Sequence, residues 1–165
     1  MPRSAAIALV TVWAFLTLGV AAARTAPAPM PPLRTAGAFM LDDIRFKVDG
    51  KWDLVWQSLY PAHQAEAPRR IFDRCEAGTP FAAPLQGATL AGVRRTAVRV
   101  PGQAGTVPGV AVTVRVALEW YGPRDPIQFE HTFHLVPVNG RWTWLLSKQR
   151  YALYAHEGCR NLPAA

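Results

Sequence analysis

The sequence has few cysteines, no long run of basic residues and none of the short motifs that mark common catalytic or nucleotide-binding sites. Only two of its 165 residues are cysteine, and two thiols without nearby histidines do not make a zinc-binding set. It contains no GxSxG, P-loop, dinucleotide-binding or HExxH pattern, so we expect no cofactor and no metal. No Lys/Arg run exceeds two residues despite a net charge of +7, which argues against nucleic acid as a partner.

Charge is also missing from residues 5–23, AAIALVTVWAFLTLGVAAA. Arg3 gives this run a positive start, and Ala21 and Ala23 fit the small-residue cleavage site of a signal peptide, with the cut before Arg24. The run is also about long enough to span a bilayer, which takes roughly 20 apolar residues. Residues 1–23 are therefore expected to be a signal peptide or an uncleaved N-terminal anchor, and the protein to be secreted or held at the cell envelope.

The rest of the chain divides into a linker and one domain. Residues 24–37, RTAPAPMPPLRTAG, are rich in proline and lack an apolar period, which is typical of a linker. Residues 38–165 then form one domain of ordinary size. Because an exported chain with an even number of cysteines permits a disulfide, we expect Cys75 to pair with Cys159.

The first half of the domain is predicted to be helical. Apolar residues recur at helical spacing in 38–48 and again, with Trp52 and Trp56 as core anchors, in 52–60. Pro61 is expected to end the second helix, and Pro68 fits the first position of a third, short helix that carries Cys75. Residues 79–92, with two prolines and two glycines, are expected to form a loop.

The second half is predicted to form four antiparallel strands, at residues 93–100, 110–120, 127–138 and 141–154. Alternation of apolar and polar residues defines the second and third strands, and Asn139-Gly140 predicts a type I′ turn after the third. This turn pairs Leu135 with Trp144 and places His131 opposite Lys148. A four-residue loop at 122–125 would pair Leu118 with Phe129.

Helices followed by a curved antiparallel sheet make an α+β fold, and the order resembles the NTF2-like (cystatin-like cone) superfamily. The stretch GKWDLVWQSLYPAHQ, followed by RRIFDRCE, is similar to small exported actinobacterial members of unknown function. The resemblance covers most of residues 38–155 and implies a pocket between the helices and the concave sheet. It does not define an activity, because members include isomerases, dehydratases and dimerisation modules.

Candidate binding residues are few, because the predicted inner face carries no Asp or Glu, which argues against proton abstraction by a carboxylate. His131 could bind an anion or act as a base beside Lys148, or could be a histidine with satisfied hydrogen bonds in the core. Lys148 and Arg150 could clamp a ligand or extend into solvent. His63 and Gln64 could close the mouth of the cone or bond the backbone freed at Pro61.

We therefore expect an exported, non-catalytic domain that binds a small ligand or a protein partner at the cell envelope. The alternative is a small isomerase- or hydrolase-like enzyme that uses His131 and Lys148, and a third possibility is a structural module of envelope machinery. The resemblance also implies a homodimer through the outer sheet face, whose residues would include Arg115, Glu119, Glu130, His134 and Tyr151.

Overall fold

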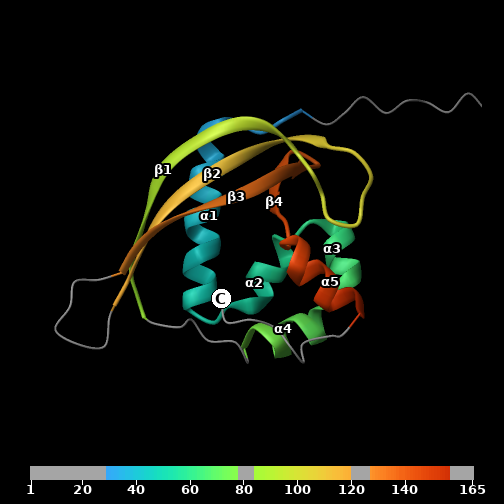
Figure 1. Cartoon of the computed structure of the whole chain (residues 1–165), viewed down its shortest axis with the longest axis horizontal. Coiled ribbons are helices and arrows are strands. Elements are labelled where there is room, and N and C mark those ends of the chain that lie inside the picture. Colours follow the sequence, from blue (N-terminus) through green and yellow to red (C-terminus); the bar gives the residue numbers. More distant parts are fainter. Residues whose placement is uncertain (1–28, 78–83, 120–126, 157–165) are drawn as a thin grey trace, which may run out of the picture.

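The computed structural model describes residues 29–77, 84–119 and 127–156, and shows helices packed on one face of a curved sheet (Figure 1). The helices and strands, in chain order, are α1 (Leu33–Val48), α2 (Trp52–Gln57), α3 (Pro61–Glu66), α4 (Arg69–Ala77), β1 (Leu85–Val98), β2 (Val107–Leu118), β3 (Ile127–Val138), β4 (Arg141–Trp144) and α5 (Lys148–His156). The fold is therefore α+β, as predicted. In the described ranges, none of the helices has the length and apolar character needed to cross a membrane.

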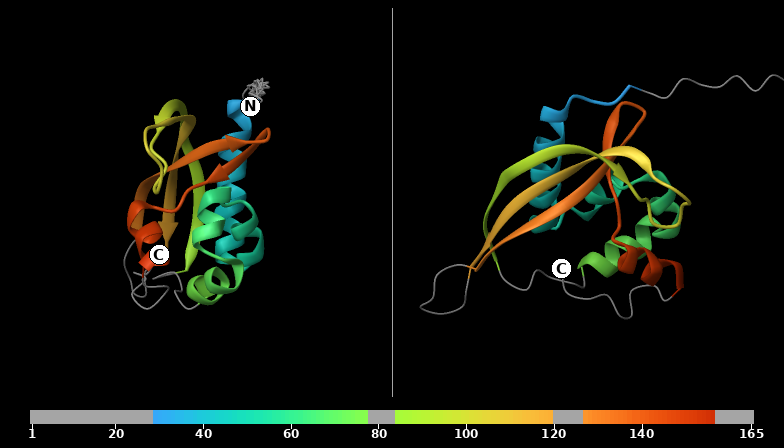
Figure 2. Two further views of the ribbon diagram at one scale, coloured as in Figure 1. Left: turned by 90° about the vertical axis from the view of Figure 1, so that its right-hand side faces the viewer. Right: turned by 45° about the horizontal axis from the view of Figure 1, so that its top comes forward.

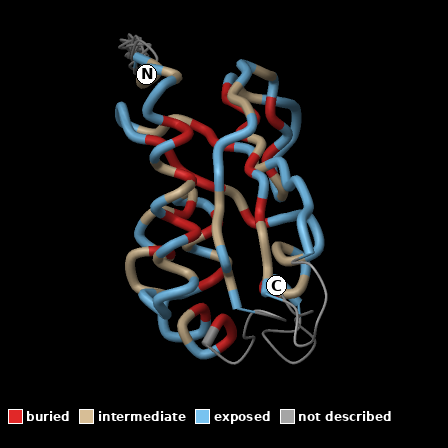
Figure 3. Tube along the Cα trace, turned by 90° about the vertical axis from the view of Figure 1, so that its left-hand side faces the viewer, coloured by how far each residue is buried: buried red, intermediate tan, exposed pale blue. Residues whose placement is uncertain are grey.

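The sheet is an antiparallel meander in the order β1-β2-β3-β4. Figure 2 shows the sheet in one layer and α1, α2 and α4 in the other. Buried residues gather between these layers (Figure 3). Alternate residues of β2 supply the sheet side of the core, and the helices supply Met40, Val55 and Phe72, each fully buried. The predicted packing of the helices on the apolar face of β2 is confirmed.

The register between β2 and β3 differs from the predicted one by two residues. Leu118 lies opposite Ile127 and Val116 lies opposite Phe129, and β2 ends at Leu118, two residues before the predicted end at residue 120. A shift of two residues keeps every side chain on its predicted face, since the side-chain period of a strand is two.

The hairpin between β3 and β4 has the predicted type I′ turn. Asn139 and Gly140 both have positive φ, at 50° and 73°, and Leu135 pairs with Trp144. The sequence prediction was wrong after this point, because β4 ends at Trp144 and residues 148–156 form α5 instead of continuing the strand. The Ser147 Oγ accepts a hydrogen bond from the backbone N–H of Arg150 at 3.2 Å, the contact by which an N-capping serine starts a helix.

Helix α1 begins at Leu33, so the last five residues of the predicted proline-rich linker are helical. Ala36 and Gly37 are buried, so this part of the predicted linker belongs to the folded domain. A Cβ on Gly37 would lie 2.6 Å from the Leu90 Cδ2 atom on β1. The glycine thus allows α1 to approach the edge of the sheet closely.

Strand β1 begins at Leu85, so most of the predicted loop 79–92 is strand, while residues 78–83 lie outside the described residues. The pairing with β2 shifts register between Leu85 and Gly87 and again between Leu90 and Gly92. Glycines in a strand often accompany such bulges. The same glycines led the sequence analysis to a loop.

The two cysteines are only partly described. Cys75 lies on α4 and is 2 % exposed, whereas Cys159 lies outside the described residues. The disulfide between them stays a prediction, as do the signal peptide or anchor at 1–23 and the linker before residue 29.

Candidate functional site

The inner face of β3 carries an exposed apolar surface. Strand β4 pairs only with residues 135–138 of β3, so no described strand extends the sheet beside the first half of β3. Ile127 and Phe129 are 41 % and 43 % exposed, although both lie on the same face as the buried valines of β2. We call this surface the concave patch; it comprises Lys47, Ile127, Phe129, His131 and Phe133.

A buried ion pair on α1 borders the concave patch. The Lys47 Nζ atom lies 2.7 Å from the Asp43 Oδ2 atom, and the Asp43 side chain is 1 % exposed. The other oxygen, Oδ1, accepts a hydrogen bond from the Ser58 hydroxyl at 2.9 Å. The charge of Lys47 is therefore balanced within the protein, and so is the carboxylate.

The same lysine stacks on aromatic rings of the sheet. Its Nζ atom lies 4.2 Å from the ring centroid of Trp144 and 5.9 Å from that of Phe133, distances at which a cation is attracted to the face of a ring. The Trp144 indole N–H donates to the Val55 carbonyl at 2.9 Å, which fixes this ring. Lys47 is thus held by contacts on both sides.

His131 is the second polar side chain of the concave patch, after Lys47. It is exposed, and its ring meets the Phe133 ring edge-on, with 4.5 Å between centroids. Partial burial lowers the pKa of His131 below the usual 6.5, and the positive charge of Lys47 and the nearby His134 lower that pKa further. The imidazole is therefore neutral at pH 7 and can both donate and accept a hydrogen bond.

The structure does not place Lys148 or Arg150 beside His131. Both lie on α5 rather than on a strand, so the predicted pairing of Lys148 with His131 was wrong. The Arg150 Nη1 atom donates to both Glu76 carboxylate oxygens, at 2.7 Å and 2.6 Å, and the Tyr154 hydroxyl donates to Glu76 at 3.0 Å. Arg150 therefore joins α5 to α4. Lys148 is exposed at the start of α5.

His63 and Gln64 lie on α3, and their side chains contact backbone groups. His63 is fully buried; its Nδ1 accepts the Leu146 N–H at 3.0 Å, which leaves Nε2–H to donate to the Pro101 carbonyl at 3.0 Å. Gln64 donates to the Trp56 carbonyl at 2.8 Å. These contacts connect α3 with the chain after β4 and with the β1–β2 turn. A role for either residue in ligand binding remains a prediction.

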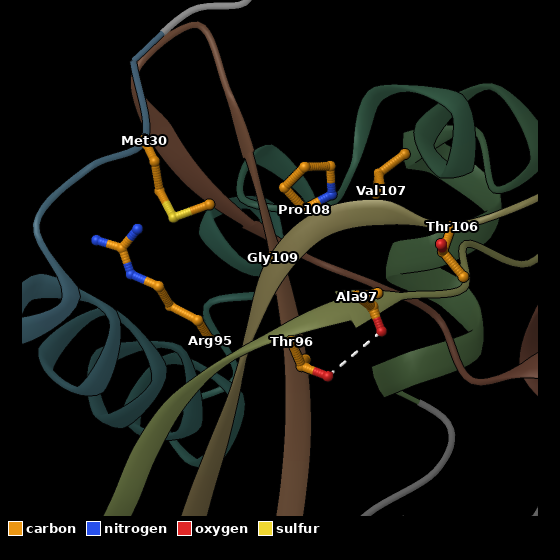
Figure 4. Close-up of a pocket in the computed structure, with 8 residues that line it drawn as sticks. All are labelled: Met30, Arg95, Thr96, Ala97, Thr106, Val107, Pro108 and Gly109. Atoms are coloured by element: carbon orange, nitrogen blue, oxygen red, sulfur yellow. Dashed lines mark hydrogen bonds between the residues drawn. The ribbon is translucent and has the colours of Figure 1, made fainter.

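A shallow depression of about 540 Å³ lies elsewhere, at the end of the sheet where β1 turns into β2. Figure 4 shows the side chains of Met30 and Arg95 at one side of it and Pro108 and Val107 along another. None of the candidate residues named from the sequence lines it. Arg95 is its single charged residue, so the depression does not bring together groups that could carry out acid–base chemistry.

The outer face of the sheet is polar. Arg115 and Glu130 form an exposed ion pair at 2.8 Å, and the hydroxyls of Thr113 and Thr132 lie 3.0 Å apart. Tyr151, which the sequence analysis placed on this face, lies on α5 with its ring 5.0 Å from that of His63. Dimerisation through the outer face stays a prediction.

Comparison with known proteins adds no further assignment: no protein-family model matches the chain, and no curated protein matches its sequence. Within the described ranges, no cluster of three or more His, Cys, Asp or Glu side chains could hold a metal ion. The geometry of the concave patch is therefore the main guide to function.

Sequence reasoning missed the ion pair beside the concave patch. Asp43 lies between Met40 and Ile44 on the apolar stripe of α1, and Lys47 follows it by one helical turn. A carboxylate on the apolar stripe of a helix, followed by a lysine four residues later, is a pattern that predicts such a buried ion pair.

Proposed function

We propose that this protein is an exported, non-catalytic domain with an NTF2-like cone fold that binds a small apolar ligand on the concave patch. The observation that carries the proposal is the exposure of Ile127 and Phe129 on the face of the sheet that elsewhere forms the core. Apolar surface on a concave sheet face is typical of ligand-binding sites. Export is supported by the uncharged run of residues 5–23 and the Ala-x-Ala sequence at its end.

The charges around the concave patch define the ligand class. Lys47 is already paired with Asp43, so a ligand anion would compete with a buried carboxylate. His131 is neutral at pH 7, because its pKa is lowered by burial and by the charge of Lys47. The patch therefore favours an uncharged ligand with an aliphatic or aromatic body and one hydroxyl or carbonyl group that can reach His131.

The alternative of an isomerase- or hydrolase-like enzyme receives no specific support from this geometry. His131 and Lys148 lie on different elements, and no hydrogen bond or ion pair joins them in the described ranges of the chain. Asp43, the buried carboxylate beside the patch, is engaged by Lys47 at 2.7 Å and by the Ser58 hydroxyl.

The experiment is a titration with naphthol, a fluorescent, uncharged aromatic alcohol that fits this ligand class. We expect Phe129→Ser to weaken naphthol binding by about tenfold or more, because burying an aromatic side chain against an apolar partner contributes roughly 1.5–3 kcal/mol. Ile71→Ser on α4 is the matched control, since Ile71 is 39 % exposed but lies outside the concave patch. Equal binding by both variants would overturn the proposal.

A further inference from the structure

The first half of β3 has a free hydrogen-bonding edge. In a type I′ hairpin the residues that flank the turn, here Val138 and Arg141, exchange backbone hydrogen bonds, and the direction of these bonds alternates along the strand. The backbone groups of Gln128, Glu130 and Thr132 therefore point away from β2. Strand β4 ends before it reaches them, and no other described strand pairs with them.

The two edges of the sheet differ in how they are protected. Strand β1 is interrupted by two register shifts and carries the exposed Arg94 and Arg95, features that discourage pairing between molecules. The segment of β3 from Ile127 to His134 pairs with β2 without a shift and contains no proline, glycine or lysine. The edge of β3 therefore lacks the usual protection in this segment.

We propose that two copies of this chain associate through the free edge of β3, with the two strands antiparallel around a twofold axis at His131. The pairing would join two four-stranded sheets into one continuous sheet. The pairing shares Phe129, His131 and Phe133 with the concave patch, but its tests measure association of the chain and need no ligand.

The residues that would meet across this axis are complementary. On the outer face Glu130 lies opposite Thr132 of the second copy, so the Glu130 side chains of the two copies do not face each other. A twofold axis at Glu130 would place these two carboxylates directly opposite each other, which is unfavourable. On the inner face Phe129 lies opposite Phe133 of the second copy, and aromatic cross-strand pairs are stabilising. The separation of the two glutamates and the pairing of the aromatic rings thus favour the same register, and the β3 strand of a second copy of this chain supplies both features.

The first test measures the molar mass of the purified full chain in solution by light scattering. We expect the wild-type chain to have the mass of two copies and Glu130→Pro the mass of one, because proline removes the N–H at the free edge and leaves the bonds to β2 intact. Glu130→Ala is the matched control: it loses the same exposed ion pair with Arg115 but keeps the N–H, and should remain a dimer. A wild-type monomer, or a dimeric Glu130→Pro that is folded by circular dichroism, would overturn the proposal.

The second test does not depend on the folding of the proline variant. Residues opposite each other on an antiparallel pair have Cβ atoms about 4.5–5.5 Å apart, close enough for a disulfide after a small adjustment. Under mild oxidation His131→Cys should form a covalent dimer, whereas Thr89→Cys, exposed on β1, should behave as the wild-type chain does. Failure of His131→Cys to cross-link, or equal cross-linking of both variants, would contradict pairing at this edge.

Discussion

At the scale of single residues, the histidines differ most from what their sequence positions suggested. His131 was predicted to lie opposite Lys148, either as a ligand-binding residue or as a histidine with satisfied hydrogen bonds in the core. It lies exposed on the concave patch, near Lys47. His63 follows Pro61, which was expected to end a helix and instead begins α3. The imidazole is fully buried and hydrogen-bonded at both ring nitrogens. Sequence reasoning could not find these bonds, because Pro101 and Leu146 come next to His63 only when the β1–β2 turn folds back on α3.

The bonds of His63 predict a large loss of stability on truncation. His63→Ala leaves the buried Leu146 N–H and the Pro101 carbonyl without their partner and opens a cavity, which together should lower the free energy of unfolding by about 3–5 kcal/mol. Urea denaturation followed by tryptophan fluorescence measures this. His131→Ala is the control and should cost less than about 1 kcal/mol, since His131 is exposed. Similar losses in the two variants would show that the His63 bonds contribute little.

The same histidine also contributes to the pH dependence of stability. Burial lowers the pKa of His63 in the folded protein below the usual 6.5, so the unfolded chain binds the proton more readily and stability must fall as the pH is lowered through about 6.5. His131 has a shift of the same sign. The free energy of unfolding can be measured at pH 7.5 and at pH 5.5, about one unit on either side of the ordinary histidine pKa of about 6.5. We expect the decrease between these pH values to be smaller in His63→Gln than in the wild-type chain. An unchanged decrease would contradict this assignment.

At the scale of elements, strands with regular alternation and a strong turn could be predicted, and elements defined by tertiary contacts could not. The faces of β2 and β3 and the Asn139-Gly140 turn were correct, because period-two alternation and positive φ are local properties. The start of β1 was missed because its bulges place glycines inside a strand. The predicted continuation of β4 was wrong because Ser147 caps α5, and because Glu76 from a distant helix binds Arg150 and Tyr154 of α5.

The bond between α4 and α5 gives a prediction at this scale. The Glu76 side chain is only 4 % exposed, and Arg150→Ala would leave its carboxylate with the Tyr154 hydroxyl as the one described partner. We therefore expect Arg150→Ala to lower the free energy of unfolding by about 3–5 kcal/mol. Arg115→Ala is the matched control, because it breaks the exposed pair with Glu130 and should cost less than about 1 kcal/mol. Thermal unfolding of both variants tests this prediction. Equal decreases in melting temperature would mean that burial does not strengthen the ion pair between Arg150 and Glu76.

At the scale of the whole molecule, the candidate site exists because β3 extends beyond the helices and beyond β4. The helices fill the inner face of β2, and β4 is only four residues long. Among the described strands, none continues the sheet beside the first half of β3, which has apolar side chains exposed on one face and unpaired backbone groups along one edge. The sequence predicted that the inner face of β3 is apolar. It could not predict that half of this face is exposed, because that depends on where β4 ends and α5 begins.

The most direct test of the account is to map naphthol binding on the folded chain by nuclear magnetic resonance. The account predicts that the side-chain signals of Ile127, Phe129 and Phe133 shift on addition of naphthol, while those of Ile71 on α4 and of Met30 in the shallow depression stay where they are. Shifts centred on Met30, or no shift at the three residues of β3, would contradict binding at the concave patch.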